Sequence, residues 1–242
     1  MKRTKWIAGL AVVLAFACAK APEGEAPKTD PAARQAEWSW LEGAKKELDR
    51  QREELASLKD QATAGAAVQP QIASVDAEVT RQSTELNRRL ADFINADPPV
   101  VGEPMRPDQL SAIRMKSAED IVIAREFIEL GGDYRKAIDI YQSALTIDPE
   151  NPELKAALAD AQAKRFMTPE RFALVKKKMN EGQVVAAIGR PLARNVRDYP
   201  EKKVKAWFYP KNEAGEAAGV FLTDQGEVYS TDFDAVKRAD QQ

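Results

Sequence analysis

The chain has 242 residues and a formal net charge of −2, from 36 lysines and arginines against 38 aspartates and glutamates. It contains no histidine and one cysteine, Cys18. This composition excludes Ser-His-Asp and Cys-His catalysis, zinc sites built on histidine or paired cysteines, and haem ligation by histidine. The nearly balanced charge gives no reason to expect nucleic-acid binding, and the sequence has no glycine-rich phosphate loop. We therefore expect a non-enzymatic protein without a cofactor or a metal site.

The N-terminus has the pattern of an export signal. Three basic residues within the first five precede the apolar run 6–16, which is too short to span a bilayer and has the length of a signal-peptide core. Residues 14–18, Leu-Ala-Phe-Ala-Cys, resemble a bacterial lipobox, although alanine stands at position 15, where leucine is commonest. The resemblance implies that residues 1–17 are a signal peptide and that Cys18 carries a lipid anchor for the membrane.

A second interpretation of this segment stays open. Ala15-Phe16-Ala17 also satisfies the small-x-small rule for ordinary secretory cleavage, which would leave Cys18 as the N-terminal thiol of a soluble periplasmic protein. An unpaired exposed thiol is a liability in an oxidising compartment, so we favour lipidation. No aspartate follows Cys18. By the enterobacterial sorting rule, this implies the outer membrane, with the protein facing the periplasm.

The next hundred residues predict a tether, a helical hairpin and a linker. Residues 18–35 are rich in alanine, proline and charge without hydrophobic periodicity, so they predict a disordered tether. Within residues 36–96, apolar residues recur three and four apart in two stretches separated by a glycine and a proline. This pattern predicts a helical hairpin or coiled coil whose two apolar stripes bury each other. Residues 97–110 contain four prolines and predict a linker.

Residues 111–166 predict a small helical unit. Residues 132–149, GDYRKAIDIYQSALTIDP, resemble the second half of a tetratricopeptide repeat. The resemblance implies that residues 117–130 form the first helix of the repeat and that residues 152–164 form a following helix. It also assigns packing roles to five residues, which are Gly132, Ala137, Tyr141, Ala144 and Pro149. A single repeat does not build the superhelix that groove-type peptide binding needs, so we do not expect that mode of binding.

Residues 167–242 predict a small α+β domain. Thr168 is placed to cap a helix that runs to about Met179, and Asn180 to cap a second helix that ends at Gly189. Three β-like runs follow, and they predict a three-stranded antiparallel meander. The runs are residues 204–209, 218–223 and 227–231.

The order and spacing of residues 169–233 resemble the SmpA/OmlA family. The residues that carry the resemblance are Phe172, Val175, Met179, Asn180, Gln183, Val184, Ile188, Gly189, Pro191, Trp207, Tyr209, Val220, Phe221, Asp224, Gln225, Gly226 and Val228. Lys178 stands where that family has a glycine. The family includes a small lipoprotein of the outer-membrane β-barrel assembly machinery, so the resemblance implies a role in outer-membrane assembly or maintenance. Trp207 and Tyr209 are candidates for either a partner surface or the core of the sheet.

Together these patterns predict a multidomain, mainly α protein with a helical hairpin, a tetratricopeptide-like unit and a small α+β domain. We expect a non-enzymatic envelope lipoprotein that serves as an interaction or scaffold component for other envelope proteins. One alternative is a soluble periplasmic binding or inhibitor protein. Another is a cell-wall glycan hydrolase that uses a carboxylate pair, for which Asp224 and Asp232 are the first candidates.

Overall fold

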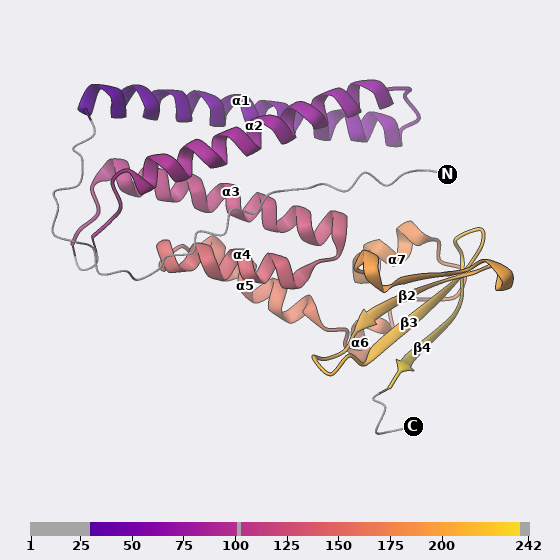
Figure 1. Ribbon diagram of the computed structural model, residues 1–242. Coiled ribbons are helices and arrows are strands. Elements are labelled where there is room, and N and C mark those ends of the chain that lie inside the picture. Colours follow the sequence, from indigo (N-terminus) through magenta and orange to yellow (C-terminus); the bar gives the residue numbers. More distant parts are fainter. Residues whose placement is uncertain (1–29, 101–102, 238–242) are drawn as a thin grey trace. The chain divides into compact units, whose positions relative to one another are not determined.

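The computed structural model describes residues 30–100 and 103–237, and Figure 1 shows their helices and sheet. The expected signal peptide, Cys18 and most of the expected tether lie outside the described residues. The chain divides into two compact units, one up to Lys116 and the other from Ser117. The division falls within helix α3, Pro107–Gly131. None of the helices in the described part of the chain combines the length and the apolar character needed to cross a bilayer.

The first unit is built on a hairpin of two long helices. α1 spans Pro31–Thr63 and α2 spans Gln69–Asn95, and the two lie side by side in Figure 1. Their facing stripes supply the buried residues, which are three leucines and Gln51 in α1 and mostly leucine, valine and phenylalanine in α2. Fully burying one such side chain contributes about 1.5–3 kcal/mol, so the hairpin is held mainly by this seam.

Helix α1 begins earlier than the sequence predicted. The expected tether ended at residue 35, whereas the helix starts at Pro31. The Asp30 carboxylate accepts a hydrogen bond from the Ala32 backbone N–H, and proline suits the first helical position because its missing N–H would have no partner there. The cap at Asp30 and the proline after it therefore allow the helix to begin before the first residues with hydrophobic periodicity. The expected linker is also shorter, since α3 already begins at Pro107.

The second unit begins with three helices. The later part of α3 packs with α4, Tyr134–Ile147, and α5, Pro152–Arg165. The Asp133 carboxylate caps α4, and the Asn151 side chain caps α5 by accepting hydrogen bonds from two backbone N–H groups. The core between these helices contains Ile121, Ala124, Ala137, Ile138, Tyr141, Ala144, Leu154 and Ala161.

The α+β part of this unit contains two short helices and one sheet. α6 spans Pro169–Phe172 and α7 spans Glu181–Ile188. The strands are β1 (Val196–Tyr199), β2 (Val204–Pro210), β3 (Ala217–Thr223) and β4 (Val228–Val236), which pair antiparallel in the order β1-β2-β3-β4. Single-turn 3-10 helices flank β1 at Ala193–Asn195 and Pro200–Lys202.

Two predictions for this domain were wrong. The sequence predicted three strands, whereas the described sheet has four. The sequence did not predict β1 because it is a four-residue edge strand, Val-Arg-Asp-Tyr, with three exposed residues and no alternation of apolar and polar residues. The helix predicted from Thr168 to about Met179 ends at Phe172. The chain then turns, and Lys178 adopts the left-handed conformation, with φ 70°.

Trp207 and Tyr209 lie in the core of the sheet. Each is 5 % exposed, and both pack with residues of α6, α7 and the two neighbouring strands. Their alternation along β2 puts them on the face covered by the helices. The structure therefore gives these residues a packing role and does not present them as a partner surface.

Candidate functional site

A groove of about 620 Å³ lies beside the tetratricopeptide-like helices of the second unit. α3, α4 and α5 line it together with Val185 of α7 and the Gly189–Arg190 segment that follows α7. The apolar part of the lining comes from Ile128, Ala156, Ala157 and Val185. The groove is therefore a composite of the helical unit and the α+β domain.

A close backbone contact joins these two parts. Gly132, in the turn between α3 and α4, has φ 65°, and a Cβ at this position would lie 2.3 Å from the Arg190 carbonyl oxygen. It would also approach the backbone of Pro191 at 2.7 Å and Leu192 at 2.9 Å. Only glycine permits this approach. The sequence assigned Gly132 to packing within the repeat, but its contact partner is the segment after α7, and no local sequence signal indicates a partner so distant in the chain.

Hydrogen bonds hold the end of α7 at the mouth of the groove. The Tyr209 hydroxyl donates to the Gly189 carbonyl at 3.0 Å, and Arg171 donates to the Ile188 carbonyl at 3.1 Å. Arg171 also donates to the Lys164 carbonyl at the end of α5, at 2.9 Å. Burial raises the pKa of Tyr209, so its hydroxyl stays protonated and remains a donor at neutral pH. These hydrogen bonds between Tyr209, Arg171 and the backbone carbonyl groups hold this wall of the groove in place.

Tyr141 lies on the groove and keeps an unused polar group. It is 1 % exposed, and its hydroxyl forms no hydrogen bond within the described part of the chain. Burial raises the pKa of this hydroxyl, the Arg125 guanidinium lowers it, and Asp160 and Glu129 raise it again. Tyr141 and these three charged residues all line the groove.

The rim of the groove is strongly charged but balanced. Six of the thirteen lining residues carry charge, namely Arg125, Lys164, Arg190, Glu129, Glu153 and Asp160. Lys164 pairs with Asp160 at 2.7 Å, and Arg190 donates to the Glu129 backbone carbonyl at 3.3 Å. The side chains of Arg125, Glu129 and Glu153 form no ion pair within the residues that the structure describes. Charges of both signs are therefore available to a ligand.

The other residues with predicted roles are placed as follows. Ala137 and Ala144 are buried between the helices of the second unit, and Pro149 is exposed in the turn after α4.

Asp224 and Asp232 are both exposed. Asp232 pairs with Gly219, whereas Asp224 follows the last residue of β3, Thr223, which lies roughly 13 Å further along the sheet. Glycosidase carboxylates lie within about 10 Å of each other, and this separation disfavours the hydrolase alternative.

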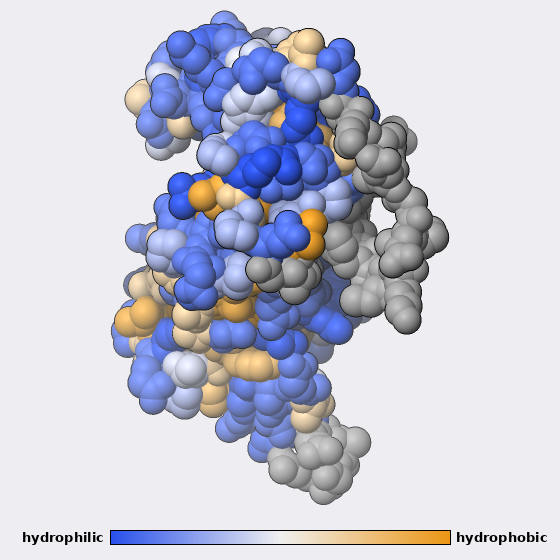
Figure 2. All heavy atoms as spheres, turned by 90° about the vertical axis from the view of Figure 1, so that its left-hand side faces the viewer, coloured by the Kyte–Doolittle hydropathy of each residue, from blue (hydrophilic) through white to orange (hydrophobic). Residues whose placement is uncertain are grey.

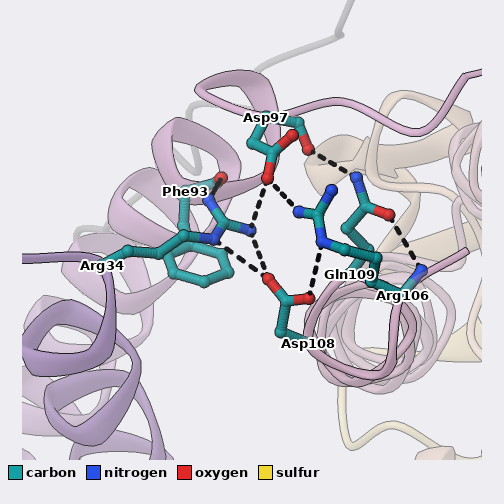
Figure 3. A network of polar contacts seen from close by, with 6 residues as sticks. All are labelled: Arg34, Phe93, Asp97, Arg106, Asp108 and Gln109. Carbon is teal, nitrogen blue, oxygen red and sulfur yellow. Dashed lines mark hydrogen bonds and ion pairs between the residues drawn. The ribbon is translucent and has the colours of Figure 1, made fainter. Parts of the chain in front are cut away.

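The first unit holds a second polar cluster, drawn in Figure 3. Arg34 of α1 bonds to Asp108 at 3.0 Å and stacks over the Phe93 ring at 3.8 Å, while Arg106 pairs with both Asp108 and Asp97. Burial alone would raise the pKa of Asp108, but hydrogen bonds from the two arginines lower it below its usual value. These charged groups bind one another across the ends of three helices, which indicates a structural role.

A hollow of about 440 Å³ also lies in the first unit, between the start of α1 and the end of α2, and its lining includes Arg34, Arg89 and Phe93. No cluster of three histidine, cysteine, aspartate or glutamate side chains occurs among the described residues that could hold a metal ion. The face drawn in Figure 2 is mostly hydrophilic, and its apolar residues occur in small groups. A broad apolar docking patch, such as those that mark many stable interfaces, is not seen on that face. The composite groove is therefore the leading candidate.

Comparison with known proteins supports the helical part of this site. A tetratricopeptide repeat model matches residues 131–165, which comprise α4 and α5. The match includes the helix that the sequence analysis placed after the repeat. No curated protein and no solved structure matches the chain, and the resemblance of residues 169–233 to the SmpA/OmlA family receives no support from these comparisons. The chain thus contains a tetratricopeptide repeat, a module typical of protein–protein interaction.

Proposed function

We propose that this protein is a non-enzymatic scaffold that binds other proteins of the cell envelope through the groove beside its tetratricopeptide repeat. The observation that carries the proposal is the composite groove itself. α3, α4 and α5 form one side, and the α+β domain supplies the wall that further repeats would otherwise provide. A single repeat is too short to form a groove by itself, and here the α+β domain completes it.

The proposed location rests on the N-terminal sequence. The basic start, the apolar run and Cys18 support export followed by lipidation, and the absence of aspartate after Cys18 supports the outer membrane. Acylation adds about 0.8 kcal/mol of membrane affinity for each buried methylene group. A lipid anchor would hold the binding groove near the membrane surface without a transmembrane helix. A specific role in outer-membrane assembly rests on the resemblance of residues 169–233.

Two measurements test this proposal. Metabolic labelling with a fatty-acid analogue should label the wild type and leave Cys18→Ala unlabelled, whereas equal labelling would exclude an anchor at Cys18. Chemical cross-linking in intact cells, followed by purification of the tagged full-length protein, should recover the same envelope proteins in independent cultures. If no envelope protein is recovered reproducibly, the scaffold proposal is wrong.

A further inference from the structure

We propose that this protein forms a dimer through the open face of its sheet, which is the face turned away from α6 and α7. Two copies stack these faces on each other and are related by a two-fold axis parallel to the strands. The groove takes none of its lining from the strands, so the open face is a separate surface. Self-association there goes beyond the proposed function and does not depend on it.

The register of the strands identifies the residues of the open face. Trp207, Tyr209 and Val220 pack in the core with residues of α6 and α7, so the positions that alternate with them point to the opposite side of the sheet. On the central strands these outward positions are Val204, Ala206, Phe208 and Pro210 of β2 and Ala217, Gly219, Phe221 and Thr223 of β3. The two central strands therefore carry no charged residue on the open face.

This lack of charge is unusual for a sheet face that meets water. When one face of an antiparallel sheet covers a core, the other face is commonly polar. Charged residues make up 31 % of this chain, yet Thr223 supplies the one polar side chain on the central part of the open face. Contiguous apolar residues on such a face mark a site of interaction with another molecule.

Three aromatic rings in contact form the centre of the open face. Phe208 contacts Phe221 with ring centroids 6.3 Å apart, and Phe221 contacts Tyr229 of β4 at the same separation. Tyr229 is 44 % exposed, and both phenylalanines are partly exposed. The planes of these two ring pairs are inclined by 89° and 52°, so the rings do not form a flat platform for a sugar ring. Their edges and faces instead suit the aromatic side chains of another protein surface.

The two edge strands give the open face opposite charges at its two sides. Arg197 of β1 pairs with Ala206, and Asp232 of β4 pairs with Gly219, so both charged side chains share the face of the aromatic rings. Arg197 donates hydrogen bonds to backbone carbonyl groups, and Asp232 accepts one from the Asp234 backbone N–H. Neither forms an ion pair within the described residues. The open face therefore has a basic edge and an acidic edge.

This distribution of charge favours a second copy of the chain as the partner. A two-fold axis parallel to the strands places β1 of each copy opposite β4 of the other, so the same contact forms twice. Arg197 lies level with Ser230 in the sheet. Asp232 is two residues further along, about 7 Å, which an arginine side chain spans. The dimer thus pairs both edges, whereas a partner with charge of one sign would leave one edge unpaired.

The size of the open face sets the strength expected for the dimer. Strands of seven residues at about 3.4 Å per residue, in a sheet of four strands about 4.8 Å apart, give a face of roughly 400 Å². Stable interfaces bury about 800 Å² of accessible surface on each partner, and the open face is at the small end of that range. We therefore expect a weak dimer, with a Kd of about 10–100 µM.

The test is a charge exchange in the purified full-length protein, measured by sedimentation equilibrium. Arg197→Asp and Asp232→Arg each replace two attractive contacts of the dimer by two repulsive ones. An equimolar mixture of these two variants restores both contacts, because one copy then carries two aspartates and the other two arginines. The double variant restores them between identical copies. Arg135→Asp is the matched control, since Arg135 is exposed on α4, outside the sheet.

We expect each single charge variant to raise the Kd of the dimer about 10-fold or more, and the mixture and the double variant to return it to the wild-type value. Arg135→Asp should leave the Kd unchanged. Tyr229→Glu should also raise the Kd at least 10-fold, while Leu174→Glu should not, because Leu174 is exposed between α6 and α7. Circular dichroism of each variant reports whether its fold is retained.

Three results would overturn the proposal. The first is a wild-type protein that stays monomeric up to about ten times the expected Kd. The second is self-association of equal strength in the wild type and both single charge variants, since association through any other surface is the same in all of them. The third is a monomeric wild type whose position 229, carrying a photoreactive residue, cross-links to a different protein in cells. None of these results bears on binding at the groove.

Discussion

The contact between Gly132 and the segment after α7 gives a sharp test of the composite groove. In Gly132→Ala, the left-handed φ of 65° costs a residue with a Cβ about 1–2 kcal/mol. The new Cβ would also lie 2.3 Å from the Arg190 carbonyl oxygen, and overpacking of this kind costs about 1–3 kcal/mol. The variant should therefore lose about 2–5 kcal/mol of unfolding free energy, a large part of the ~5–15 kcal/mol that holds a typical domain.

The neighbouring glycine provides a matched control. A Cβ at Gly131 would meet nothing within 4 Å, and this residue does not have a positive φ. Gly131→Ala should therefore change stability by less than about 1 kcal/mol, with a slight gain from higher helix propensity. Urea unfolding followed by circular dichroism measures both variants, and hydrogen exchange in α4 localises the effect. Equal stability of the two variants would refute the close approach and with it the fixed wall of the groove.

Three further predictions concern other parts of the molecule. Lys178→Gly should raise the unfolding free energy by up to about 1 kcal/mol, because glycine adopts φ 70° without the penalty that lysine incurs; a lower melting temperature would contradict this. The pKa of Asp108 is lower in the folded protein than in the unfolded chain, where it is near 4. The Asp108 carboxylate therefore stabilises the folded protein fully above about pH 4, and this stabilisation is lost as the pH falls through the pKa of the folded state. Acid titrations of unfolding should therefore show a weaker pH dependence in Asp108→Asn, and an unchanged profile would show that the pairs with arginine do not contribute. Trp207→Ala should cost about 3–5 kcal/mol because the side chain is buried, whereas a loss below 1 kcal/mol in urea titrations would indicate a surface role.

The regular parts of the fold could be predicted from residue patterns. Apolar residues three and four apart marked the long helices, and Asn180 and Gly189 marked both ends of α7. The alternation around Trp207 and Tyr209 marked β2, but it could not show which face of the sheet is covered. That choice depends on where α6 and α7 pack, and no local pattern carries this information.

The parts that could not be predicted depend on contacts between residues far apart in the chain. β1 exists because it pairs with β2, although its own four residues have little strand character. Lys178 keeps its left-handed turn because its backbone N–H donates to the Val228 carbonyl, while Val228 donates back to Met179. The groove likewise arises where the repeat meets the segment after α7. Because the sequence shows a single repeat, it did not predict a groove.

Site-specific photo-cross-linking in living cells tests the central claim most directly. A photoreactive phenylalanine analogue is placed at position 156, inside the groove, or at position 159, on the same helix but outside it. If the groove binds envelope proteins, irradiation should give a discrete adduct with a partner from position 156 and none from position 159. No adduct at either position, or identical adducts at both, would contradict the account.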